Sequence, residues 1–173
     1  MTAPGPDRSV VFQQFALFPW KTVTQNIEFG LRSLNIDAKT RAERVKHYIE
    51  FMGLAGYEQG FPHQLSGGMQ QRVAIARAYV LDPKVLLMDE PFGALDALTR
   101  SEMHRVLMAV REQVAPTIVL VTHDIAEAVA IADSVLVASP APMRIVSRVC
   151  VADAGPDAAH EILTSLRAAG VNA

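Results

Sequence analysis

The feature that most limits how this chain can fold is the stretch of residues 64–96, QLSGGMQQRVAIARAYVLDPKVLLMDEPFGALD. A Ser-Gly-Gly triplet opens a run with helical spacing. Asp82-Pro83 ends the run, because proline has no N–H to donate and disfavours helix in the residue before it. The apolar residues 85–88 then predict a strand buried on both faces of a parallel sheet. This order predicts an α/β fold with polar groups at the carboxyl end of a strand.

The residues at the two ends of this stretch suit a phosphate ligand. A helix N-terminus carries unpaired N–H groups and partial positive charge, so Ser66, Gly67 and Gly68 favour close approach of an anion. The carboxylates of Asp89 and Glu90 follow the predicted strand, where ligands sit in open α/β sheets. Mg²⁺ takes oxygen ligands and keeps several waters, so one carboxylate near it suffices. The second carboxylate is then free to orient or deprotonate an attacking water.

Together these residues resemble the signature and Walker B region of an ATP-binding-cassette (ABC) ATPase. Ser66-Gly67-Gly68, with Met69 after it, is similar to the signature motif, and residues 85–90 are similar to the Walker B strand. Residues 94–96, ending in Asp96, resemble the D-loop. The resemblance implies that Ser66 to Met69 and Asp96 contact ATP, that Asp89 holds Mg²⁺, and that Glu90 is the catalytic carboxylate.

Two more segments resemble motifs of the same family. Residues 10–12 predict a short strand that ends at Gln13, which is similar to the Q-loop glutamine that contacts Mg²⁺ and the attacking water. Residues 117–121 (TIVLV) predict a second buried parallel strand, which delivers His123 to the edge that carries Asp89 and Glu90. The resemblance implies that His123 is the switch histidine, which contacts the γ-phosphate and holds Glu90 and the water in place.

An aromatic cluster follows Gln13, and it has two interpretations. In ABC ATPases the equivalent segment lies near the groove that receives a helix of the membrane permease, and an exposed Phe-Pro-Trp run suits an apolar docking surface. The alternative is that these side chains belong to the core, as aromatic residues more often do. The side chains in question are Phe15, Leu17, Phe18 and Trp20.

The resemblance covers about residues 8–148 and implies a partial RecA-like P-loop NTPase core with an inserted helical subdomain. We expect residues 1–20 and 81–148 to form the RecA-like part and residues 21–80 the helical subdomain. Thr22 or Thr24 is expected to cap the first helix and Asp37 the second. Residues 149–173 form a tail without a recognised motif, in which we expect a helix over residues 157–169.

Composition excludes several classes of protein. The 173 residues carry a net charge of −2 and are 50% apolar, which is ordinary for a globular domain and does not favour a nucleic-acid partner. No apolar run approaches the 18 or so residues of a membrane span, and we expect no signal peptide. Cys150 is the only cysteine, so no internal disulfide is possible.

One motif of the family is absent. No two of the ten glycines stand five positions apart, so the P-loop pattern G-x-x-x-x-G-K-[ST] does not occur. The sequence therefore resembles an N-terminally truncated ABC ATPase. Sites in this family combine the P-loop of one subunit with the signature of another in a head-to-tail dimer, so we expect no appreciable ATPase activity from the chain alone. We also expect the strand at residues 85–88 to expose ladder groups and an apolar face.

The resemblance also implies a place in the cell and a branch of the family. Met69 after the glycine pair, the lead at residues 5–8 and the Leu-Phe-Pro-Trp run at residues 17–20 are similar to the ATPases of nitrate, sulfonate and taurine importers. Such a subunit binds a membrane permease at the cytoplasmic face of the inner membrane. Two other functions stay open. One is a non-catalytic module that docks on a permease or on a complete ABC ATPase, and the other is an ABC ATPase that works outside transport, for example on nucleic acid.

Overall fold

The computed structural model describes residues 5–171, apart from the side chain at position 114, and divides the chain into two compact units at position 121. The first unit holds a three-stranded parallel sheet with four α-helices, and the second holds a two-stranded antiparallel sheet with three α-helices, counted over the described positions. Parallel strands joined by helices confirm the predicted α/β class. The division falls inside residues 81–148, which the sequence assigned to one RecA-like part.

The sheet of the first unit brings three segments distant in sequence side by side. Its order is β1 (Arg8–Val11), β2 (Val85–Asp89) and β3 (Thr117–Val121), all parallel. Met88 is paired with Val11 on one side and with Leu120 on the other. The carboxyl ends of the strands therefore meet at one edge, where the residues that follow them can form a site.

The burial of this sheet differs from the prediction. Leu86 and Met88 of β2 are buried, whereas Leu87 between them is 41% exposed. The same face of the sheet exposes 47% of Val119 and 55% of Val121. The expectation that residues 85–88 and 117–121 are buried on both faces is therefore wrong, because alternate side chains point to opposite faces and only one face is covered. The expected exposed apolar face is confirmed. The expected free ladder groups on β2 are not, since β2 is the central strand.

A layer of helices follows β1, and a side chain caps the start of each of its two α-helices. Thr22 caps α1 (Val23–Glu28) in a reciprocal arrangement with Gln25, and Asp37 caps α2 (Ala38–Phe51). Between and after these helices lie the 3-10 turns η1 (Gly30–Ser33) and η2 (Pro62–Gln64). Both predicted caps are thus confirmed, and each satisfies N–H groups that a helix start leaves unpaired.

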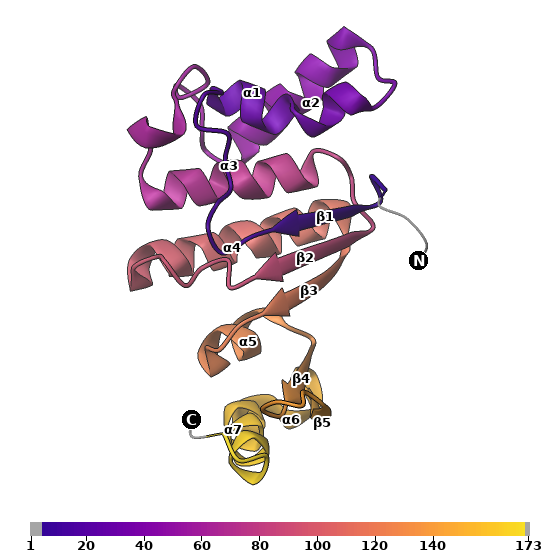
Figure 1. The fold of residues 1–173 in the computed structure, drawn as a ribbon, viewed down its shortest axis with the longest axis vertical. Helices are drawn as coiled ribbons and strands as arrows, with labels where there is room; N and C mark the ends of the chain where they lie inside the picture. The colour runs from indigo at the N-terminus through magenta and orange to yellow at the C-terminus, as the bar shows by residue number, and fades with distance from the viewer. Residues whose placement is uncertain (1–4, 172–173) are drawn as a thin grey trace. The chain divides into compact units, whose positions relative to one another are not determined.

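The core of the first unit forms where two longer helices meet this layer and the strands. Helix α3 (Gly67–Tyr79) lies between the layer of α1 and α2 and the strands, and α4 (Ala97–Val114) runs behind the strands in the view of Figure 1. Both helices bury apolar residues at helical spacing. Large apolar side chains that are fully buried on them include Val73, Ile75 and Tyr79 of α3 and Met103, Leu107 and Val110 of α4.

The second unit has its own small core. Helix α5 (Ile125–Ile131) leads to the hairpin of β4 (Ser134–Ala138) and β5 (Ile145–Cys150), and α7 (Ala158–Ala168) packs on that hairpin. The centre of this core is Val137, Val149 and Ile162. The helix expected over residues 157–169 is confirmed. Helix α6 (Val151–Ala154) and the turn η3 (Gly155–Asp157) were not predicted.

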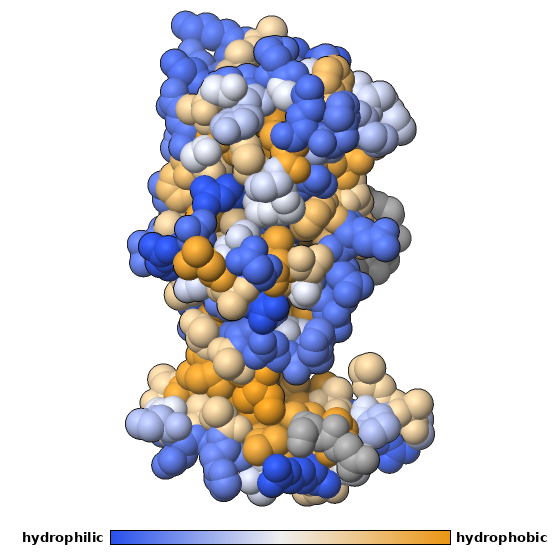
Figure 2. Space-filling model, turned by 90° about the vertical axis from the view of Figure 1, so that its left-hand side faces the viewer, coloured by the Kyte–Doolittle hydropathy of each residue, from blue (hydrophilic) through white to orange (hydrophobic). Residues whose placement is uncertain are grey.

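The surface is mixed. The helices at the top of the molecule present mostly hydrophilic side chains with small apolar patches between them (Figure 2). Over the part of the chain that the structure describes, none of the helices has the length and apolar character that crossing a membrane requires.

Candidate functional site

The centre of the candidate site is a hydrogen bond between the residues that follow two neighbouring strands. Gln13 follows β1 and Glu90 follows β2, and the side-chain amide of Gln13 donates from Nε2 to Oε2 of Glu90 over 2.9 Å. The backbone N–H of Glu90 donates to the carbonyl of Val121 at the end of β3. All three strands therefore help to fix the Glu90 carboxylate.

The backbone around Glu90 is held in an uncommon conformation. Glu90 has a φ of 41°, in the left-handed region, and its carbonyl accepts a hydrogen bond from Gly93 at 3.2 Å. A Cβ on Gly93 would lie 3.7 Å from Oε2 of Glu90 and 4.0 Å from Nε2 of Gln13. Left-handed non-glycine residues cost about 1–3 kcal/mol and cluster at functional sites. The turn of residues 90–93 thus aims Glu90 at Gln13.

The residues present at this edge fit a magnesium ion only if other ligands complete its shell. Asp89, the last residue of β2, is exposed beside Glu90, and an amide oxygen remains on Gln13. Among the described residues, no group of three or more His, Cys, Asp and Glu side chains could hold a metal ion. Mg²⁺ commonly takes one or two protein oxygens and fills its octahedron with water and substrate phosphates. Asp89 and Gln13 therefore suit a metal that arrives with a phosphate ligand.

The predicted signature forms the start of α3. Ser66 is the N-cap, and its hydroxyl accepts a hydrogen bond from the backbone N–H of Met69 at 3.3 Å. Ser66 and Gly67 are exposed, whereas Gly68 is buried against α4. A Cβ on Gly68 would lie 2.5 Å from Cγ2 of Thr99. The glycine pair thus leaves one side of the helix start open to an anion and lets the other side approach α4 closely.

Asp96 has a structural role in addition to its predicted one. It is the N-cap of α4, and one carboxylate oxygen accepts hydrogen bonds from the backbone of Leu98 and Thr99. The other oxygen accepts from the Thr99 hydroxyl at 2.8 Å. Hydrogen bonds from the Thr99 backbone and then from its hydroxyl hold the pKa of Asp96 below its usual range. The predicted D-loop and signature therefore lie against each other through Thr99 and Gly68.

His123 follows the third strand at two positions beyond Val121, and it belongs to the second unit. Its predicted role toward the γ-phosphate and Glu90 stays a prediction. Of the predicted site residues, the structure places Gln13, Asp89 and Glu90 at the carboxyl end of one sheet. It places Ser66 to Met69 and Asp96 at the junction of α3 and α4.

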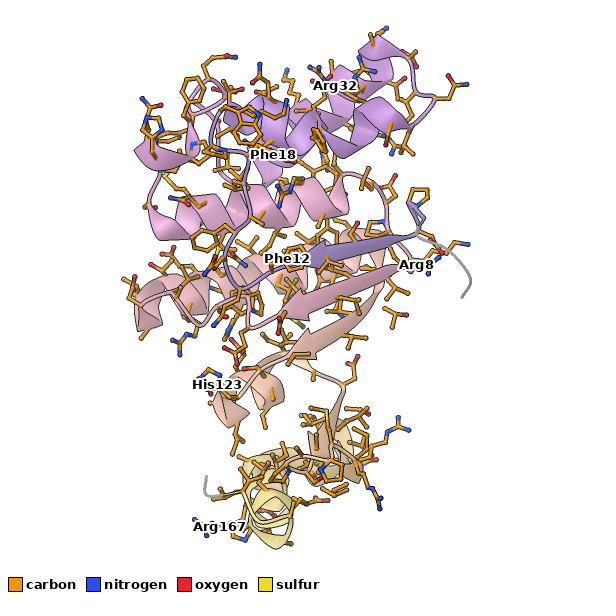
Figure 3. The ribbon with its side chains drawn as sticks, viewed as in Figure 1. Arg8, Phe12, Phe18, Arg32, His123 and Arg167 are labelled. Atoms are coloured by element: carbon orange, nitrogen blue, oxygen red, sulfur yellow. The ribbon has the colours of Figure 1, made fainter. Side chains whose placement is uncertain are left out.

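The aromatic residues after Gln13 are not core. Trp20 is 70% exposed and Phe29 is 46% exposed, while Phe15, Leu17 and Phe18 are half-buried. The ring of Phe18 lies 4.4 Å from that of Phe29 and 5.9 Å from that of Trp20, measured between centroids. Figure 3 shows Phe12 at the carboxyl end of β1 and Phe18 beyond α3, on the side of α1. We call Phe18, Trp20, Lys21 and Phe29 the aromatic surface.

Two residues that the sequence analysis did not select hold this segment in place. Asn26 of α1 is fully buried, and its amide binds both backbone groups of Phe18 and the carbonyls of Lys21 and Thr22. Arg77 of α3 donates to the carbonyls of Phe15 and Ala16. A sequence signal existed for Arg77, because it is a charged residue in the apolar part of its helix, between Ala76 and Ala78. Asn26 carried no such signal, because its short helix VTQNIE is mostly polar.

The residues of this sequence supply only some of the groups that a nucleotide site uses. The P-loop pattern, whose backbone amides and lysine cradle phosphates, is missing from the sequence. The described residues supply carboxylates, an amide and one helix N-terminus. They suit the edges of a phosphate site rather than its cradle.

Comparison with known proteins finds a family model and relatives that match more than half of this chain. Residues 2–93 match the family model described as ABC transporter. The nitrate import ATP-binding protein NrtD of Synechocystis is 48% identical over 145 residues, which are 84% of this chain and 54% of that protein. The taurine import ATP-binding protein TauB of Yersinia pestis is 46% identical over 148 residues, 86% of this chain and 58% of that protein.

A solved structure has the same fold. The structure of CbiO1 from Clostridium perfringens, described as part of the ABC transporter complex CbiONQ, matches with a TM-score of 0.77 and 28% identity. The match covers 95% of this chain and 66% of that one. The chain therefore spans a little more than half the length of the curated relatives it matches.

Proposed function

Since the chain belongs to the ABC transporter family, we propose that it acts as part of the ATP-binding and ATP-hydrolysing subunit of a bacterial importer. The transported solute would be a small anion such as nitrate, a sulfonate or taurine, in keeping with the names of its relatives. The observation that carries the proposal is the hydrogen bond between Gln13 and Glu90, which joins the Q-loop residue to the carboxylate after the Walker B strand.

Each predicted site residue has a chemical part in this proposal. ATP supplies the phosphoryl group, and Mg²⁺ neutralises the charge on its phosphates. Asp89 and Gln13 would hold the metal, and Glu90, with His123, would orient and deprotonate the attacking water. Ser66, Gly67, Gly68 and Met69 would contact the phosphates of ATP bound by a second subunit, with Asp96 beside them.

In its proposed role, the chain would be held at the membrane by its protein partners. The aromatic surface presents two exposed rings and a cation, which suits a helix of a permease with an apolar side and an acidic residue. The permease would hold the chain at the cytoplasmic face of the inner membrane. The second ABC subunit would bind head to tail, across the start of α3.

A mixing experiment tests whether the signature of this chain can complete a site in trans. The partner is a full-length relative in which the serine that matches Ser66 has been replaced by arginine, so that its own dimer is inactive. We expect addition of this chain to restore ATP hydrolysis. The Ser66→Arg form of the chain restores none, whereas Glu90→Gln restores as much as the unmodified chain, because Glu90 serves the site that has no P-loop.

The same experiment distinguishes the proposed function from the alternative of a non-catalytic module. The missing P-loop pattern favours a non-catalytic module that docks on a permease or a complete ABC ATPase. Such a module would bind the partner in a pull-down assay and restore no hydrolysis. Hydrolysis by the isolated chain that is lost in Glu90→Gln would contradict both accounts. Salt-sensitive DNA binding would instead support work on nucleic acid.

A further inference from the structure

Arg77 makes three contacts with one short segment of chain. It lies in the last turn of α3, where its neighbours Ala76 and Ala78 are buried. Its Nη1 donates to the carbonyl of Ala16 at 2.7 Å and its Nη2 donates to the carbonyl of Phe15 at 3.2 Å. The guanidinium carbon lies 5.6 Å from the centroid of the Phe18 ring. One side chain therefore binds two successive carbonyls and stacks on the ring that follows them.

The chemistry of arginine suits this position better than that of lysine. A guanidinium offers parallel N–H donors in a rigid fork and stacks on aromatic faces, whereas an ammonium is a single point charge. Burial lowers the pKa of Arg77, but arginine stays charged in proteins. Hydrogen bonds from a charged donor are about twice as strong as neutral ones. The segment that Arg77 binds includes Ala16, whose φ of 47° is uncommon for a residue with a side chain.

The segment is hydrogen-bonded to two parts of the first unit, the sheet edge and the helices. Gln13, at the end of β1, is bonded to Glu90 of the sheet edge. Phe15 and Ala16 are bonded to α3 through Arg77. Phe18, Lys21 and Thr22 are bonded to α1 through Asn26. Only the exposed Gln14 stands between the sheet-bound and the helix-bound residues. The carbonyls that Arg77 holds therefore begin two residues after Gln13, so that the position of α3 limits where Gln13 can lie.

We propose that Arg77 is the positioning residue that makes Gln13 follow helix α3 and so sets the hydrogen bond between Gln13 and Glu90. The inference deepens the proposed function, because α3 also carries Ser66, Gly67 and Gly68 at its other end. A phosphate bound at the start of α3 and the carboxylate of Glu90 are then connected through one guanidinium. Arg77 itself touches no reacting atom.

The test follows the side-chain amide of Gln13 in the ¹⁵N-labelled full chain by NMR, without nucleotide. We expect Arg77→Gln to move the Gln13 Nε2–H₂ signals toward their positions in Glu90→Ala, where the acceptor is gone. The matched control is Arg72→Gln, since Arg72 lies on the same helix and also donates to a backbone carbonyl, that of Met52, at 2.9 Å. This control leaves the Gln13 signals in place.

Hydrogen exchange gives a second readout. Loss of the hydrogen bonds from Arg77 should loosen the neighbouring Phe18, whose amide donates to Oδ1 of Asn26, and so raise exchange of that amide roughly tenfold in Arg77→Gln while leaving α4 unchanged. Arg77→Lys, which keeps the charge, should give an intermediate change in both measurements. If Arg77→Gln does not fold, Arg77→Lys and Phe18→Leu carry the test.

A purely structural Arg77 would lower the unfolding temperature and leave the Gln13 signals of the folded state unmoved, and that result would overturn the inference. Neither measurement uses ATP. A chain that fails to support hydrolysis in the mixing experiment would contradict the proposed function and leave the link from Arg77 to Gln13 standing.

Discussion

At the scale of single residues, Gly68 shows why the helix that carries the candidate signature needs a residue without a side chain. A Cβ at position 68 would meet the methyl group of Thr99. The hydroxyl of Thr99 is fixed by its hydrogen bond to Asp96, so the methyl group cannot turn away unless that bond is lost. The requirement comes from packing within the chain and is separate from any contact with phosphate.

Gly68→Ala should therefore destabilise the first unit by about 1–3 kcal/mol, the usual cost of overpacking, although alanine favours helix more than glycine does. Thr99→Ser removes the methyl group and keeps the hydroxyl. We expect the double variant Gly68→Ala/Thr99→Ser to recover most of the loss in urea unfolding. Additive effects of the two changes would show that the contact does not limit the position.

A second single-residue prediction concerns Glu28. Burial raises the pKa of this carboxyl, but hydrogen bonds from Arg32 and Arg41, at 2.7 Å and 2.6 Å, outweigh burial and hold the pKa below its usual range. A lowered pKa in the folded state means that the stabilisation is complete above the ordinary carboxyl pKa and is lost as the pH falls through the folded-state value.

We expect the unmodified chain to be more stable than Glu28→Gln at pH 7, and the difference to shrink steadily below about pH 4.5. Urea unfolding across this range measures the difference. Glu43→Gln is the control, because Glu43 is exposed and reaches Lys39 only at 4.0 Å. A pH-independent difference would show that the ion pairs at Glu28 do not stabilise the fold.

At the scale of elements, the exposed face of the parallel sheet is the main liability. It presents Leu87 of β2 and Val119 and Val121 of β3, next to Val10 at 41% and Phe12 at 51% exposure. A flat apolar face of this kind favours association. The sheet edges formed by β1 and β3 add to that tendency.

Leu87→Thr/Val119→Thr should reduce self-association in sedimentation velocity experiments. The cost in stability should be small, since both side chains are more than two-fifths exposed and threonine favours strands. The contrasting control is Leu86→Thr, whose side chain is fully buried and whose loss should unfold the unit. Unchanged association in the double variant would show that the chains associate through a different surface.

Comparison of the elements with the sequence shows what pattern alone can predict. The caps Thr22 and Asp37, the glycine-led start of α3 and the proline after it each leave a local signal, so the starts of α1, α2 and α3 could be predicted. The run TIVLV predicts a strand but does not reveal how many faces are covered, because β-branched residues suit both cases. The contact of Arg77 with Phe15 spans 62 residues of sequence and that of Asn26 with Phe18 spans 8, and no spacing rule predicts either pair.

At the scale of the whole molecule, the chain consists of two units with separate cores. The second unit buries Ile162 of α7 between Val137 and Val149 of the hairpin, and these three residues belong to that unit alone. A local change in this core should therefore act on one unit only.

Ile162→Ala should destabilise the second unit by about 2–5 kcal/mol and raise hydrogen exchange in β4, β5 and α7. Exchange in α3 and β2 should stay as in the unmodified chain. Ile75→Ala, in the buried face of α3, should give the reverse pattern. Equal changes in both units for either variant would mean that the chain unfolds as a single cooperative body.

The buried amide of Asn26 separates two properties of the aromatic surface. The shape of the turn at residues 18–22 is set from within, by one side chain that solvent does not reach. The chemistry that the aromatic surface presents is set by the exposed side chains of Trp20 and Phe29, of which Phe29 also packs against Phe18 with 4.4 Å between the ring centroids. The exposed ring of Trp20 can therefore change, in evolution or by design, while the buried amide that shapes the turn stays the same.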